Sequence, residues 1–290
     1  MIRVHHKAIE KGATTYPASS SFKARRVLLN KEDTDHITLQ LILTNVRYSD
    51  IFTTLVQDIV DHIATILDEE KAVAAFLARL RRWQIFLEQH NPEGLSETAQ
   101  QGLYGELWFL KQSVLPCLGM LRGLLSWSGP KATQQDFQFS GCAIEVKTTT
   151  SKQHQKLTIS SERQLDDTGT GVLILLHLSL DIRQGRGETL PDMVASVRSL
   201  LSGNPAAVET FEALLFEAGY LDVHAPRYEQ NGYTMRETNY FKVEGDFPRI
   251  VEADLRNGVG DVRYTIGVAE CKRFSVAEPE VLSLIRRQHE

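Results

Sequence analysis

The sequence predicts an α/β fold, because segments with the two-residue repeat of strands alternate with segments that have the helical repeat. Residues 136–147 contain two short alternating runs separated by a turn, and residues 171–180 form an almost continuous apolar run. Residues 48–67 place isoleucine and leucine at helical spacing. Interleaved strands and helices of this kind are typical of a sheet covered by helices.

The first 95 residues predict two strands followed by two helices. Residues 22–29 and 36–45 flank a turn-rich segment, and the second run alternates apolar and polar residues, as a strand with one buried face does. A helix is expected over 48–67 and another over 69–90, which an Asn-Pro pair ends. These elements make up an N-terminal α/β region, residues 1–95.

The rest of the chain predicts further alternation of strands and helices. The expected elements, in order, are a helix at 97–112 capped by Ser96, three short strands beyond Pro130, a brief helix at 162–165, a buried strand at 171–180, helices between Pro191 and Gly203 and at 205–218, and strands that include 240–243 and 261–268. We divide this part into a core, residues 96–182, and a C-terminal helical and β elaboration packed on the core, residues 183–290.

Composition limits the class of protein. The 290 residues are 42% hydrophobic and 24% charged, which is ordinary for a globular protein of one large domain or two joined ones. Cys117, Cys142 and Cys271 are scattered and form no Cys-x-x-Cys pair, which disfavours a structural zinc site. The same cysteines disfavour a disulfide framework, so we expect a reducing, cytoplasmic setting. The most apolar run, residues 171–178, is too short to span a membrane, and the N-terminus lacks a signal-peptide core.

Residues 136–147 predict a β-hairpin. On each side of Ser140-Gly141, apolar side chains alternate with polar ones, as in a strand with one buried face. Ser-Gly is typical of a two-residue turn, in which glycine supplies the positive φ. Counting outward from this turn pairs Asp136 with Glu145.

The Asp136–Glu145 pair is the reason to expect a metal site. Directly opposed residues on paired strands have Cβ atoms about 4.5–5.5 Å apart, so two carboxylates there repel each other. A divalent cation removes the repulsion, and carboxylate oxygens suit Mg²⁺. Lys147 lies two residues past Glu145 on the same face, where it can hold a water or a phosphate oxygen. The open alternative is a solvated hairpin whose acids pair with Lys147.

A further acid lies on the helix expected before the hairpin. Residues 102–110 are apolar apart from one carboxylate, Glu106, and they contain two glycines, each of which costs a helix about 0.8–1.0 kcal/mol relative to alanine. Gly102, Gly105 and Glu106 share a face, so Glu106 would project from a close backbone contact. The alternative is an exposed acid at the rim of a packed helix.

A second segment repeats the spacing of the hairpin acids and lysine. Asp261 precedes Glu270 by nine residues, and Lys272 follows. No turn is expected at Thr265-Ile266, and a continuous strand would hold the two acids about 30 Å apart at about 3.3 Å per residue. We therefore take this copy as a coincidence of spacing.

The distribution of charge leaves room for a nucleic-acid partner. The chain has a net charge of −5, but residues 131–165 carry five lysine and arginine residues against three acids. The candidates for contact with a nucleic acid are Lys152, His154, Lys156 and Arg163. A solvated basic face is the open alternative.

The chain resembles a bacterial family known as PD-(D/E)XK motif proteins, which is associated with restriction-like defence gene clusters. The resemblance lies in the order GLYGELWFL, Trp-Ser-Gly-Pro, DFQFSGCAIEVKTT and LTISSERQL, which begin at residues 102, 127, 136 and 157. It implies a restriction-endonuclease-like core with a mixed central sheet flanked by helices.

The resemblance also implies roles for individual residues. Asp136 and Glu145 match the metal-binding acids, Lys147 matches the catalytic lysine, and Glu106 matches the acid often found on the preceding helix. Gln135 stands where the motif name has proline, which is not a metal ligand, so the chemistry is unaffected.

These observations together predict a Mg²⁺-dependent endonuclease that hydrolyses DNA phosphodiester bonds in a restriction or phage-defence system. The cation, for which Mn²⁺ could substitute, would be held by Asp136, Glu145 and the carbonyl of Val146. The alternative is a non-catalytic DNA-binding or assembly subunit of a defence complex. Action on RNA or on single strands is equally compatible with the sequence. Besides DNA, subunits of a defence system and a second copy of the chain are candidate partners.

Overall fold

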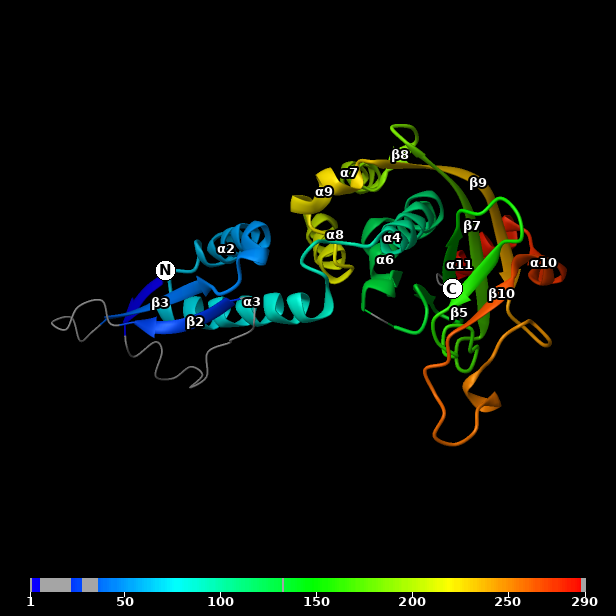
Figure 1. Ribbon diagram of the computed structural model, residues 1–290, viewed down its shortest axis with the longest axis horizontal. Coiled ribbons are helices and arrows are strands. Elements are labelled where there is room, and N and C mark those ends of the chain that lie inside the picture. The colour runs from blue at the N-terminus through cyan, green and yellow to red at the C-terminus, as the bar shows by residue number, and fades with distance from the viewer. Residues whose placement is uncertain (1, 6–21, 28–35, 132, 288–290) are drawn as a thin grey trace. The chain divides into compact units, whose positions relative to one another are not determined.

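The computed structural model describes residues 2–5, 22–27, 36–131 and 133–287, which fall into two compact units, Met1–Gly94 and Leu95–Glu290 (Figure 1). In the described part, no helix has the length and apolar character needed to cross a membrane.

The N-terminal unit combines a small sheet with two helices. Its strands β1 (Ile2–His5), β2 (Phe22–Val27) and β3 (His36–Leu43) are antiparallel in the order β1-β3-β2, and α2 (Ser49–Ile63) and α3 (Glu69–Gln89) follow. The predicted strand pair and both predicted helices are confirmed, whereas β1 was not expected. The turn expected at 30–35 lies outside the described residues.

The C-terminal unit is built on a six-stranded sheet. Its strands are β4 (Phe137–Phe139), β5 (Cys142–Thr149), β7 (Val172–Gln184), β8 (Glu188–Thr189), β9 (Asn231–Lys242) and β11 (Ser275–Val276). The order is β11-β9-β7-β5-β4, with β8 beside β9. The β5–β7 pair is parallel and the other pairs are antiparallel, so the sheet is mixed and the predicted fold class is confirmed.

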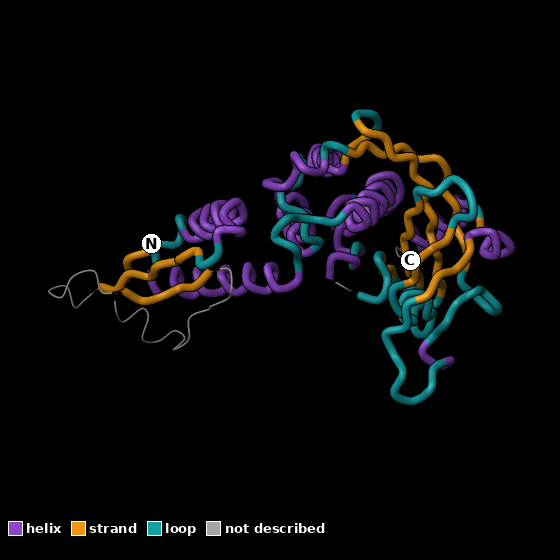
Figure 2. The backbone as a smooth tube through the Cα atoms, viewed as in Figure 1, coloured by secondary structure: helices purple, strands orange, loops and turns teal. Residues whose placement is uncertain are grey.

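Each face of this sheet is covered differently (Figure 1 and Figure 2). One face is covered by a layer of helices that shares its apolar core, namely α4 (Glu97–Phe109), α5 (Leu115–Leu118), α6 (Met120–Ser126), α7 (Leu190–Leu201), α8 (Pro205–Glu217), α9 (Ala225–Tyr228) and α11 (Glu278–Arg286). Within this layer, α8 packs on α6 and α7, and α9 packs on α7. The other face packs against a ribbon of β6 (Lys156–Ile159) and β10 (Tyr264–Gly267), next to the short α10 (Val268–Cys271). Two apolar cores therefore hold the sheet between them.

Three predicted elements are corrected. The helix expected over 97–112 ends as a regular α-helix at Phe109 and continues as a wider π-helical turn over Leu110–Val114. Residues 162–165 form turns instead of a helix. The segment after residue 218, for which strands were expected, also contains α11, because Val281 and Ile285 lie four residues apart and bury one helical face.

The contact between α4 and β5 explains one of the two helix glycines. A β-carbon on Gly105 would lie 2.5 Å from Cγ2 of Thr148, whereas a β-carbon on Gly102 would meet nothing within 4 Å. Close approach of the helix to the sheet therefore requires glycine at position 105 and does not require it at position 102.

Candidate active site

The hairpin forms in the predicted register. Phe139 pairs with Cys142 and Phe137 with Ile144, and the turn glycine, Gly141, has φ of 77°. The alternation of polar and apolar residues turns the phenylalanine at 137 and the isoleucine at 144 into the core, where both are fully buried. Extending the register by one residue beyond β4 sets Asp136 opposite Glu145.

Asp136 is fixed by the backbone of the facing strand. Its Oδ2 accepts a hydrogen bond from the backbone N–H of Val146 at 2.8 Å. A residue in a strand directs its N–H and its C=O toward the same neighbour, so the carbonyl of Val146 also faces the edge where Asp136 lies. Burial raises the pKa of Asp136, and the charge of Lys147 and the Val146 hydrogen bond oppose that rise.

Glu145 is a buried carboxylate with one ionic partner. Its side chain is 1% exposed, and its Oε1 lies 2.8 Å from Nζ of Lys147. Its Oε2 is buried and accepts no hydrogen bond from the described residues. Burial and the neighbouring charge of Asp136 raise the pKa of Glu145 to about 8. A buried carboxylate oxygen to which no described residue donates fits the role of a cation ligand.

Lys147 lies between a charged and a neutral acceptor. Besides Glu145, its Nζ donates to Oε1 of Gln164 at 3.0 Å, and its side chain is 16% exposed. Burial disfavours the ammonium form, but the carboxylates of Glu145 and Asp136 outweigh burial and raise the pKa of Lys147. The lysine is therefore charged and held in place at the edge of the site.

Glu106 reaches the same site from α4. The indole N–H of Trp127 donates to its Oε2 at 2.7 Å. A β-carbon on Gly129 would lie 2.6 Å from that oxygen and 3.0 Å from Oδ1 of Asp136. Both carboxylates thus border the space that glycine leaves open. Burial, and then repulsion from Asp136, raise the pKa of Glu106 well above its ordinary value.

The oxygen atoms in this site fit a hard divalent cation. Oδ1 of Asp136, the orphaned Oε2 of Glu145 and the carbonyl of Val146 are the kind of donors that Mg²⁺ takes. Within the described ranges, no group of three or more His, Cys, Asp and Glu side chains is arranged so that these side chains alone could hold a metal ion. Backbone carbonyl and water ligands would have to complete the coordination, as is usual for Mg²⁺, which is bound through one or two carboxylates and keeps several waters.

The four basic candidates do not all lie together. Lys152, His154 and Lys156 line one cavity of about 410 Å³, which Glu237 and Glu270 also line. Arg163 is instead exposed on the turn after β6, with its Nε 3.7 Å from Glu162. None of the three lysines of this cavity, Lys272 included, forms an ion pair within the described part of the chain.

The repeated spacing at the C-terminal end does not form a hairpin. Thr265 and Ile266 lie within β10, Glu270 lies on α10, and Asp261 lies in a loop with φ of 55°. The structure therefore does not set Asp261 and Glu270 opposite each other on paired strands.

Four residues of the site had no function assigned from the sequence. Trp127 and Gly129 were noted only as part of a Trp-Ser-Gly-Pro turn, Gln135 only as a substitute for proline, and Gln164 only within a longer motif. One signal was present, since the Gly-Pro pair of this segment marks a turn between the expected helix and the hairpin. Nothing in the sequence indicated which carboxylates that turn would meet.

One family model matches residues 4–269 of the chain, and the family is described as "Putative PD-(D/E)XK family member, (DUF4420)". No curated protein and no solved structure shows significant similarity to the chain. The match covers most of the chain, including the hairpin, Glu106 and Gln164.

Proposed function

Because the chain belongs to this PD-(D/E)XK family, we propose that it is a Mg²⁺-dependent endonuclease that hydrolyses DNA phosphodiester bonds. The observation that carries the proposal is a cluster of three acids and one charged lysine. Asp136 and Glu106 border the space beside Gly129, and Glu145, opposite Asp136 on the hairpin, pairs with Lys147. Buried acids packed together destabilise a fold, so their presence favours a functional reason.

Each side chain has a part in the proposed reaction. A cation held by Asp136, Glu145 and the carbonyl of Val146 would polarise the phosphate and activate a water molecule. Lys147 donates to a phosphate oxygen or to the attacking water. Its hydrogen bond to Gln164 keeps the ammonium group oriented for that contact. Glu106, oriented by Trp127, positions the water or a second cation.

The cavity lined by Lys152, His154 and Lys156 supports a nucleic-acid substrate. These residues follow β5, the strand that carries Glu145 and Lys147. A DNA backbone bound in the cavity would therefore lead to the proposed site. Glu237 and Glu270 in the same cavity weaken its positive electrostatic potential, so we expect the cavity to contribute moderately to DNA affinity. Arg163 would contact the substrate separately, from the turn after β6.

The alternative is a non-catalytic DNA-binding or assembly subunit of a defence complex. Retention of both metal-binding acids, the lysine and the helix acid favours the enzyme. The defence role, a cytoplasmic location, partner subunits and a homodimer stay predictions.

Cleavage assays with matched variants test the proposal. Purified protein is incubated with plasmid, linear duplex and single-stranded DNA, and with RNA, in Mg²⁺, in Mn²⁺ and in chelator. We expect metal-dependent cleavage of DNA by the wild type and none by the isosteric variant Glu145→Gln. Cleavage that persists in chelator, or that Glu145→Gln retains, would contradict the proposed site. Binding of DNA without cleavage under every condition would favour the alternative.

A further inference from the structure

Gln164 reaches the ammonium group of Lys147 from outside the hairpin. Its Oε1 accepts hydrogen bonds from Nζ of Lys147 at 3.0 Å and from the backbone N–H of Ser160 at 2.8 Å. We propose that Gln164 is a positioning residue, which holds Lys147 in the orientation that cleavage requires. The inference rests on the function proposed above.

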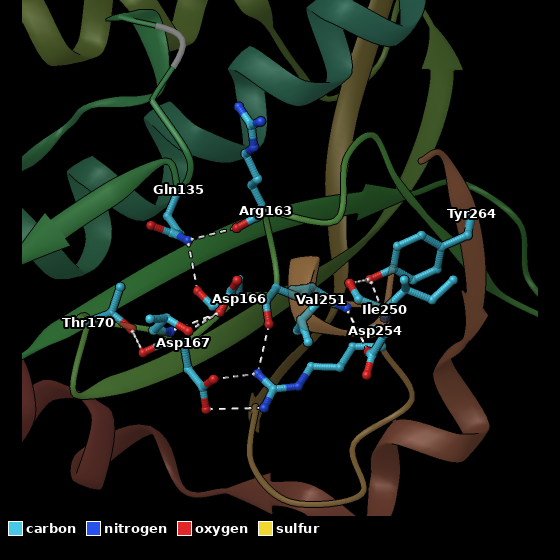
Figure 3. Close-up of polar contacts among 12 residues, drawn as sticks. Gln135, Arg163, Asp166, Asp167, Thr170, Ile250, Val251, Asp254 and Tyr264 are labelled. Carbon is cyan, nitrogen blue, oxygen red and sulfur yellow. Dashed lines mark hydrogen bonds and ion pairs between the residues drawn. The ribbon is translucent and has the colours of Figure 1, made fainter. Parts of the chain in front are cut away.

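The turn that carries Gln164 is fastened to the hairpin by a second glutamine. Gln135 is 1% exposed, and its Nε2 donates to the carbonyl oxygens of Arg163 at 3.2 Å and of Asp166 at 3.4 Å (Figure 3). These carbonyls flank Gln164 in the chain, and Gln135 directly precedes Asp136. The position of Gln164 is therefore fixed relative to the proposed metal-binding acid.

A third contact holds the same turn from its other side. Arg249 donates from Nη1 to the carbonyl of Leu165 at 2.8 Å and forms an ion pair with Asp167 at 3.0 Å. The backbone of the turn thus has side-chain anchors on both sides of position 164. A glutamine held this firmly can restrict a neighbouring side chain, because little entropy remains to be lost when the contact forms.

The chemistry of the amide suits this role better than a second acid would. A lysine side chain is a flexible stem with a compact charge, so a single ion pair with Glu145 leaves it freedom to move. The amide oxygen of Gln164 accepts a second, directional hydrogen bond from the ammonium group and does not neutralise its charge. That charge stays available to a phosphate. If the carboxylate of Glu145 is engaged by a cation, the hydrogen bond to Gln164 is the contact that remains.

Gln164→Met tests the role, because methionine keeps the length of the side chain and removes its hydrogen bonds. Gln138→Met is the matched control, since Gln138 is exposed on β4 of the same hairpin. We expect Gln164→Met to lower single-turnover cleavage about 10- to 100-fold at saturating DNA, as loss of an outer partner does in metal sites. Its DNA dissociation constant in chelator should stay unchanged. Gln164→Glu, which retains the acceptor oxygen but adds a negative charge beside the ammonium group, should recover only part of the turnover rate.

An NMR measurement reports whether the ammonium group of Lys147 is held by hydrogen bonds. In ¹⁵N-labelled protein without DNA, a hydrogen-bonded lysine ammonium gives a resolved signal, which Lys147→Arg identifies by its disappearance. We expect the signal to broaden or vanish in Gln164→Met and to persist in Gln164→Glu and Gln138→Met. A turnover rate of Gln164→Met equal to that of the wild type overturns the inference. So does an unchanged lysine signal in that variant, even if its turnover falls. A wild-type protein that cuts no substrate would instead contradict the proposed function, and the lysine signal would still test the contact.

Discussion

The carboxylate of Asp136 accepts the backbone N–H of Val146, 2.8 Å away across the end of the hairpin. One carboxylate oxygen is thereby used to fix the side chain, while the other faces Glu106 over Gly129. The bond also shows that the hydrogen-bonding side of Val146 points to this edge. In that pattern, residues 136 and 145 occupy a non-hydrogen-bonded pair, whose side chains approach most closely. The backbone geometry therefore forces the two acids together.

Gly129→Ala should fill the space between two of the acids. The new methyl group would lie 2.6 Å from Oε2 of Glu106, so that carboxylate must move. We expect cleavage to fall about 100-fold, as displacement of a reacting group by about 1 Å can cause, and the rise in melting temperature with Mg²⁺ to shrink. Gly203→Ala is the control, because a β-carbon at Gly203 meets nothing within 4 Å. Equal cleavage by both variants would exclude the space beside Gly129 from the site.

The acids and the lysine should affect DNA affinity in opposite directions. Without a cation, ionised Asp136 and Glu145 repel a phosphate, so Asp136→Asn and Glu145→Gln should remove cleavage yet tighten DNA binding in chelator. The test belongs at about pH 9, above the pKa of about 8 of Glu145. Lys147→Ala should abolish cleavage and weaken binding, whereas Lys242→Ala, which removes a half-exposed lysine on β9 that pairs with Glu244, should change neither.

The binding and cleavage of these variants could also contradict the proposed site. If neither amide variant binds DNA more tightly than the wild type, the acids do not lie at the scissile phosphate. Wild-type cleavage by a folded Lys147→Ala protein would remove the lysine from the mechanism.

The stability of the metal-free protein should decrease as the pH rises from about 4.5 to about 8. Burial and Asp136 raise the folded-state pKa of Glu145 from 4.5 to about 8, so the folded protein retains a proton that the unfolded chain releases. The stabilisation is complete below the unfolded pKa and is lost as the pH passes through the folded pKa. Because Mg²⁺ needs the ionised form, its effect on the melting temperature should be larger near pH 8 than near pH 6.

Calorimetry or a melting series across this range measures both effects. Glu145→Gln should flatten the pH dependence and reduce the shift with Mg²⁺. A melting temperature that rises with pH in the metal-free wild type, or that Mg²⁺ leaves unchanged at every pH, would contradict the metal site.

Replacing each of the two glycines of α4 by alanine should change the stability of the protein in opposite directions. Gly102→Ala should stabilise the protein by about 0.5–1 kcal/mol, because alanine favours the helix and a β-carbon there meets nothing within 4 Å. Gly105→Ala should destabilise it by about 1–3 kcal/mol, because the methyl group would lie 2.5 Å from Thr148 on β5. Denaturant unfolding of both variants measures the difference. Equal effects would mean that α4 does not approach β5 as closely as described.

The sequence by itself determined the hairpin and the three residues at its end. The alternation on each side of Ser140-Gly141 fixes the register, and the register alone opposes Asp136 to Glu145 with Lys147 on the same face. These relations span twelve residues, so local backbone geometry is sufficient to establish them. The same holds for α3 and α7, whose apolar spacing and end signals are local.

The tertiary structure decided which distant residues join that hairpin. Glu106, Trp127 and Gly129 meet Asp136 because α4 packs on β5 and the Trp-Ser-Gly-Pro turn docks on the carbonyl of Asp136, to which Ser128 and Gly129 donate. Gln164 meets Lys147 because the turn after β6 is anchored from two sides. Such meetings depend on packing between segments far apart in the chain, and neither periodicity nor spacing carries that information.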